Sequence, residues 1–129
     1  MSNLISLKTF TRTYVDVALR LVEEGDISQG EFYNSLVRIV SEETRLPIDA
    51  VEYLSSGFHQ ALFLGNNGSP FSYDTSPRSL WKSPTIRLLR HISDEERNNL
   101  VGYLIQENKD FLRSRVSNLS GSGVPIDYF

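Results

Sequence analysis

His59 has more potential catalytic neighbours along the sequence than any other residue of this chain. Ser56 lies three residues before it and Glu52 seven residues before it, so in a helix the three side chains would share one face. Serine, histidine and a carboxylate are the set that many hydrolases use for acyl transfer. That chemistry also needs a strained turn or an oxyanion hole, and a helix interior offers neither. We therefore expect no enzyme, and a packed, hydrogen-bonded His59.

Metal ligands are few and scattered in this sequence. The 129 residues contain no cysteine and only two histidines, His59 and His91. His91 lies four residues before Glu95, but a predicted helix start falls between them, so an ion pair is the simpler interpretation. The glycines of residues 65–68 lack the lysine that a nucleotide-binding loop requires. We expect neither a metal nor a cofactor.

A basic stretch over residues 78–91 is the most localised charge signal. No acid occurs between Asp74 and Asp94, whereas four Arg or Lys side chains and a histidine surround Trp81. Cations that contact phosphates, beside an aromatic ring that stacks on a base, are typical of nucleic-acid binding. The same charges would also suit a solvated surface, or one that pairs with acidic residues elsewhere in the chain.

Large aromatic side chains cluster in a loop and at the end of the chain. Aromatic residues often anchor protein interfaces, although these would equally complete the core by folding back over the ends of the helices. Together with the bases they form the predicted partner-binding set, which comprises Phe71, Tyr73, Arg78, Trp81, Lys82, Arg87, Arg90, Tyr128 and Phe129.

Charge is divided unevenly along a chain whose net charge is −3. Residues 1–64 carry nine acids and five bases, and residues 65–129 carry seven acids and eight bases. The first residues lack the basic start and long apolar run of a secretory signal. No apolar run approaches the length that spans a bilayer. We expect a soluble, cytoplasmic protein that does not associate with a membrane.

Helical periodicity dominates the first half of the sequence. Apolar residues spaced by three and four predict a helix over residues 7–24, and a Ser28–Glu31 capping box predicts another that ends near Thr44. The short link between them predicts an antiparallel hairpin. Pro47 is expected to start a third helix, in which Gly57 marks either a kink or the close approach of another helix.

The second half begins with a predicted long loop over residues 65–79. A short helix is expected after Pro84, and a Ser93–Glu96 capping box opens a continuous helix over residues 94–119. Three bases, Lys109, Arg113 and Arg115, are then expected toward the negative end of that helix dipole. No segment alternates as a strand does, so no sheet is expected.

These patterns predict an all-α fold, a single-domain bundle of four main helices plus one short helix. The domain would span residues 1–119, and residues 120–129 would form a flexible tail. The predicted function is protein–protein interaction by a helical adaptor, inhibitor or immunity-type regulator, through the aromatic and basic loop and the apolar tail. The alternative is a nucleic-acid-associated protein that uses residues 78–91. The sequence is also compatible with a homo-oligomer, because an amphipathic helix suits a dimer as well as a monomer.

Overall fold

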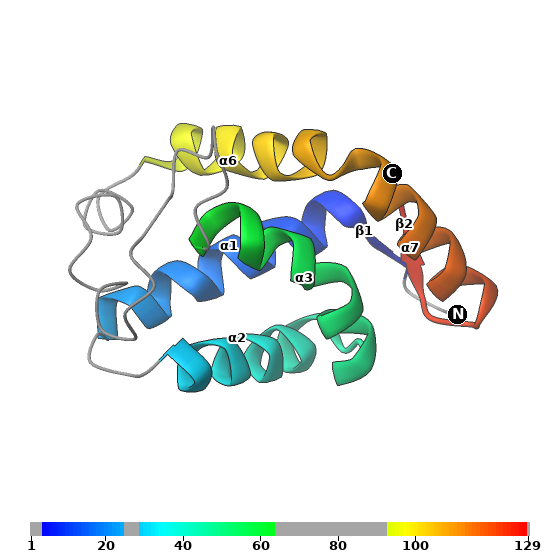
Figure 1. The fold of residues 1–129 in the computed structure, drawn as a ribbon, viewed down its shortest axis with the longest axis horizontal. Helices are drawn as coiled ribbons and strands as arrows, with labels where there is room; N and C mark the ends of the chain where they lie inside the picture. Colours follow the sequence, from blue (N-terminus) through cyan, green and yellow to red (C-terminus); the bar gives the residue numbers. More distant parts are fainter. Residues whose placement is uncertain (1–3, 25–28, 64–92, 129) are drawn as a thin grey trace.

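Helix α1 (Leu7–Glu24) is the central element of the computed structural model shown in Figure 1. The structure describes residues 4–24, 29–63 and 93–128, with the backbone alone at 22–24, 29–30 and 59–63. Figure 1 shows α6 along one side of α1 and α2 along the other. Helix α3 also packs against α1, because the centroid of the Phe58 ring lies 5.3 Å from that of the Tyr14 ring.

The buried face of α1 is wider than the sequence predicts. The expected apolar stripe, from Leu7 to Leu21, is buried throughout. Thr11, Val15 and Leu19 lie off that stripe and are buried as well. The Thr11 hydroxyl donates to the Leu7 carbonyl at 2.8 Å, so this buried polar atom is satisfied. Several elements pack around α1, so residues outside the predicted stripe are buried against them as well.

Helices α2 (Gln29–Thr44) and α3 (Ile48–Phe63) meet at a tight corner. Arg45 adopts the left-handed conformation there, with φ of 61°. This conformation is common at the ends of helices but is usually taken by glycine. The buried Leu46 follows, and its carbonyl accepts a hydrogen bond from the Ser41 hydroxyl at 2.6 Å. The corner therefore places α3 next to α2, and α2 itself packs against α1.

Helix α6 (Asp94–Glu107) starts with the predicted capping box, which is confirmed. The Glu96 N–H donates to the Ser93 hydroxyl at 3.2 Å, and the Ser93 N–H donates to the Glu96 carboxylate at 3.4 Å. Asp16 on α1 joins the two helices, because its Oδ1 atom accepts from Arg12 at 3.3 Å and from Arg97 at 3.2 Å.

The continuous helix expected over residues 94–119 is wrong at one position. Asn108 has φ of −118° and ψ of 19°, and it separates α6 from α7 (Lys109–Gly121). The change of direction brings the buried Leu112 and Val116 onto the core, where α7 contacts α3. Lys109 therefore lies in the first turn of a helix, and the expected role of this base at a helix C-terminus is wrong too.

Two short strands join the ends of the described chain, although no sheet was expected. Strand β1 (Ile5–Ser6) pairs in parallel with β2 (Ile126–Asp127), in the register Ile5 to Ile126. The Ile5 N–H also donates to the Pro125 carbonyl at 3.0 Å. The sequence predicts a flexible tail over 120–129, but in the structure α7 extends to Gly121 and residues 124–128 pack beside it, with Ile126 buried.

The predicted all-α class is confirmed. The expected loop over residues 65–79, the short helix after Pro84 and the Ser28 cap lie outside the described residues. Within the described ranges, no helix combines the length and the apolar character that crossing a bilayer would take.

Candidate functional site

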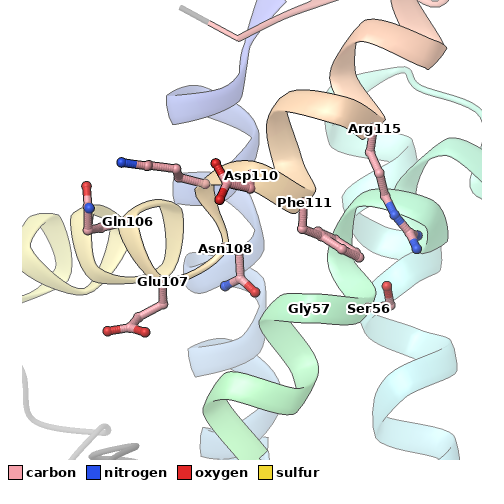
Figure 2. A pocket seen from close by; sticks show the side chains of 9 residues that line it. Ser56, Gly57, Gln106, Glu107, Asn108, Asp110, Phe111 and Arg115 are labelled. Atoms are coloured by element: carbon pink, nitrogen blue, oxygen red, sulfur yellow. The ribbon is translucent and has the colours of Figure 1, made fainter.

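An open pocket of about 480 Å³ lies where α3 passes the kink between α6 and α7 (Figure 2). Its wall combines the middle of α3, the end of α6 and the first turns of α7. Both polar and aromatic side chains face it. The lining residues are Ser56, Gly57, Gln106, Glu107, Asn108, Lys109, Asp110, Phe111 and Arg115.

Gly57 explains how the kink comes so close to α3. A Cβ atom at this position would lie 2.8 Å from the Asn108 Oδ1 atom and 3.3 Å from the Phe111 Cε1 atom. The first distance is shorter than real Cβ contacts, so only glycine fits without a shift. The sequence left a choice between a kink and a close approach at Gly57. The close approach is confirmed, and α3 continues through this residue.

Asn108 is fixed in place by its own helix. Its side-chain Nδ2 atom donates to the Leu104 carbonyl at 2.8 Å. Its backbone N–H donates to the Ile105 carbonyl at 3.3 Å, which tightens the last turn of α6. The remaining side-chain oxygen faces Gly57. The floor of the pocket is therefore held by hydrogen bonds.

Arg115 lies close to two aromatic rings at the other side of the pocket. Its guanidinium carbon is 3.9 Å from the centroid of the Phe111 ring and 4.2 Å from that of Tyr53. Its Nη1 atom donates to the Tyr53 carbonyl at 2.6 Å. The Tyr53 hydroxyl in turn accepts from the Asn118 side chain at 3.0 Å. We call Tyr53, Arg115 and Phe111 the aromatic–arginine stack.

Charges in the pocket lining balance. Lys109 and Arg115 are cationic, and Glu107 and Asp110 are anionic at neutral pH. Figure 2 shows Glu107 and Arg115 on opposite sides of Asn108, so the acid and the stacked base are not in contact.

The catalytic set considered from the sequence is divided between different environments. Ser55, the residue before Ser56, is buried, and its hydroxyl has no hydrogen-bond partner among the described residues. Ser56 is half-buried in the pocket wall, and Glu52 is exposed. The His59 side chain lies outside the described residues. No group of three or more His, Cys, Asp or Glu side chains in the described ranges is placed to hold a metal ion.

Among the predicted partner-binding residues, only Tyr128 lies within the described part of the chain. Tyr128 is half-buried against the core, and the Arg113 guanidinium carbon lies 5.1 Å from the centroid of its ring. The other predicted residues lie outside that part: Phe71, Tyr73, Arg78, Trp81, Lys82, Arg87, Arg90 and Phe129.

The residues of the pocket were largely missed by sequence reasoning. Two of them were noticed: Ser56 as a member of the catalytic set, and Gly57 because a glycine inside a helical pattern often has a packing reason. Arg115 was expected only as a base that favours the helix dipole, and Phe111 lies in the helix that was expected to be continuous over residues 94–119. Tyr53 gave no signal at all. Comparisons with protein-family models, with curated proteins and with solved structures found no significant match to this chain.

Proposed function

We propose that this protein acts by binding another protein, and that the pocket at the α6–α7 kink is part of the contact surface. The observation that carries the proposal is the aromatic–arginine stack in the wall of an open pocket. Tyrosine and arginine contribute much of the binding energy at protein interfaces, and phenylalanine is enriched there.

The rigidity of the stack supports the same proposal. Arg115 is confined by two rings and by its hydrogen bond to the Tyr53 carbonyl, and Tyr53 is held by Asn118. Ordering a flexible arginine on binding costs free energy, and a side chain already held in place avoids much of that cost. A preformed anchor of this kind suits recognition of a partner.

The proposed protein is a regulator without catalytic activity, an adaptor, inhibitor or immunity-type protein of the cytoplasm. Trp81 and Arg87 belong to the predicted partner-binding residues and would contribute contacts of their own. The nucleic-acid alternative rests on residues 78–91, which lie outside the described residues.

Site-specific photo-cross-linking in the cells that make the protein tests the proposal. A photoreactive amino acid replaces Gln106, an exposed residue at the rim of the pocket. A matched variant carries it at Asn34, an exposed residue of α2, which contributes no pocket residue. We expect one discrete protein adduct from position 106 and none from position 34.

The cross-linked protein is then purified and its affinity for the chain measured by calorimetry. Phe111→Ala removes one ring of the aromatic–arginine stack and should weaken binding about tenfold or more, as truncation of an interface anchor does. Equal adducts from both positions would contradict the proposal. Unchanged affinity of Phe111→Ala, with the variant folded, would contradict it too.

A further inference from the structure

The Arg115 guanidinium makes no ion pair with any carboxylate that the structure describes. The described ion pairs of arginine side chains involve Arg12, Arg20 and Arg97 instead. Arg115 is half-buried, and a cation that has lost part of its hydration normally has an anion beside it. Arg115 is therefore held in place without a carboxylate of the described residues beside it.

The free donors of Arg115 lie in the plane of the guanidinium. The guanidinium carbon lies 4.2 Å from the centroid of the Tyr53 ring and 3.9 Å from that of Phe111. A guanidinium has five N–H donors, and one of them is used on the Tyr53 carbonyl. The edge that remains is suited to two parallel hydrogen bonds to the oxygens of one anion.

Ser56 adds a neutral donor to the lining of the pocket. It lines the pocket from α3, and in Figure 2 its hydroxyl points toward the Arg115 guanidinium. A hydroxyl can rotate to donate to an oxygen that the arginine also binds. An anion with two oxygens in one plane would thus meet donors from both α3 and α7.

The charge of the pocket decides between a carboxylate and a phosphate. Glu107 and Asp110 balance the two bases of the lining, so a phosphate with nearly two negative charges would meet two carboxylates. A carboxylate carries one charge and matches Arg115 alone. The acids would then favour a segment that carries a cation as well, as protein surfaces often do.

We propose that this pocket binds the carboxylate of an aspartate or glutamate side chain of a protein partner, with Arg115 as the anchoring cation and Ser56 as a second donor. The proposal rests on the proposed function and names the group that the partner presents. It also assigns Glu107 and Asp110 a selective role, since they disfavour phosphate groups at the same place.

Titration of the ¹⁵N-labelled full chain with sodium acetate, followed by NMR, tests the proposal. Sodium chloride at the same ionic strength is the reference. We expect acetate to produce saturable shifts of the Gly57 and Asn108 amides and of the Arg115 Nε–H signal. Arg115→Gln should weaken acetate binding about tenfold, as the loss of a hydrogen bond to a charged group does. Shifts that merely follow chloride would overturn the proposal.

Arg38→Gln is the matched control, because Arg38 is exposed on α2, away from the pocket, and the variant loses the same charge. It should bind acetate as the wild type does. If Arg115→Gln does not fold, Arg115→Lys is the second variant. It keeps the charge but loses the planar group that can donate two parallel hydrogen bonds, so it should also bind acetate more weakly. The proposal would be overturned if a folded Arg115→Gln or Arg115→Lys variant bound acetate as tightly as the wild type does.

Inorganic phosphate is the second probe, and it needs no variant. We expect weaker binding of phosphate than of acetate at equal concentration and ionic strength. Tighter phosphate binding would overturn the carboxylate proposal and favour a phosphate-bearing partner such as a nucleic acid. If acetate fails but cross-linking at Gln106 still gives the specific adduct, the carboxylate is wrong and protein binding stands.

Discussion

At Gly57 the side chain is a single hydrogen atom, and this allows α3 to pack closely against the α6–α7 kink. A Cβ atom there would lie 2.8 Å from the Asn108 side-chain oxygen. That oxygen belongs to an amide that already donates to the Leu104 carbonyl, so it cannot swing away without breaking a hydrogen bond. Gly102 on α6 is the opposite case, since a Cβ there would meet nothing within 4 Å.

Alanine substitution should therefore act in opposite directions at these two glycines. Gly102→Ala should stabilise the protein by up to about 1 kcal/mol, because alanine is the better helix former. Gly57→Ala gains the same term but adds an overpacking cost of about 1–3 kcal/mol, so it should destabilise by about 1 kcal/mol. Urea unfolding of the two variants measures the difference. Equal stabilisation by both would mean that α3 and the kink do not touch in solution.

Tyr14 is a second residue whose environment is unusual. Its side chain is fully buried beside the Phe58 ring, with centroids 5.3 Å apart, and its hydroxyl has no hydrogen-bond partner among the described residues. Burial raises the pKa of the Tyr14 phenol well above its usual value, and the nearby Tyr33 raises it further. A buried polar atom without a partner costs free energy.

Tyr14→Phe removes the unpaired hydroxyl and should stabilise the fold by about 1 kcal/mol at neutral pH. The pH dependence should change as well. The unfolded chain loses the Tyr14 proton near pH 10, and the folded chain retains it to a higher pH, so wild-type stability falls as the pH rises above about 10. In Tyr14→Phe this part of the alkaline loss should be absent. Urea unfolding between pH 8 and pH 11 provides the measurement, and identical curves for both proteins would contradict the prediction.

Among the elements, the α6–α7 kink shows what a local pattern cannot reveal. Leu104, Leu112 and Val116 continue one helical spacing across residue 108, so the sequence predicts an unbroken helix. The interruption depends on the side chain of Asn108 and on the distant Gly57, which lets the kink pack closely. A contact between residues so far apart in the sequence does not alter the spacing of the apolar residues, so that spacing cannot predict it.

The Ser93–Glu96 capping box was predictable for the opposite reason. Both of its hydrogen bonds lie within four residues, so the sequence alone contains every group involved. The pocket shares the difficulty of the kink, because its wall combines α3 with the junction of α6 and α7. Arg115 was visible as a base, and Phe111 lies four residues before it, so these two are neighbours on any helix. Tyr53 is different, because it becomes a neighbour only when α3 packs against α7.

A double-mutant cycle should reveal the coupling between α3 and the kink. Asn108→Ala alone loses the hydrogen bond to the Leu104 carbonyl and should destabilise by about 1 kcal/mol. In the background of Gly57→Ala the same change also removes the oxygen that clashes with the new methyl group. The double variant should therefore be more stable than the sum of the single effects implies, by about 1 kcal/mol. Strict additivity in urea unfolding would mean that the two residues are not in contact.

At the scale of the whole molecule, the β1–β2 pair ties the N-terminal side of the fold to α7. Ile126 is 1% exposed and belongs to the central core cluster. The strands are only two residues long, which is too short for the alternation that identifies strands in a sequence. The apolar character of the tail was visible from the sequence, whereas its position against β1 was not.

Ile126→Ala should consequently behave as a core mutation. We expect a loss of about 2–4 kcal/mol in the free energy of unfolding, since a buried isoleucine leaves a cavity when truncated. Leu4→Ala is the control at the same end of the molecule, because Leu4 is 60% exposed and should change stability by less than about 0.5 kcal/mol. Thermal unfolding followed by circular dichroism compares the two. Similar melting temperatures for both variants would show that the tail does not contribute to the core.

The same strand pair can form only late in the synthesis of the chain on the ribosome. Among the described residues, Ile5 is made early, whereas its partner Ile126 leaves the exit tunnel after all of them except Asp127 and Tyr128. The helical hairpins can form during synthesis from neighbouring segments, whereas this contact must wait. Until then the apolar residues that β2 covers stay open to solvent. A nascent chain stalled before Ile126 should therefore be held less firmly, and be cleaved faster by proteases, than the released protein.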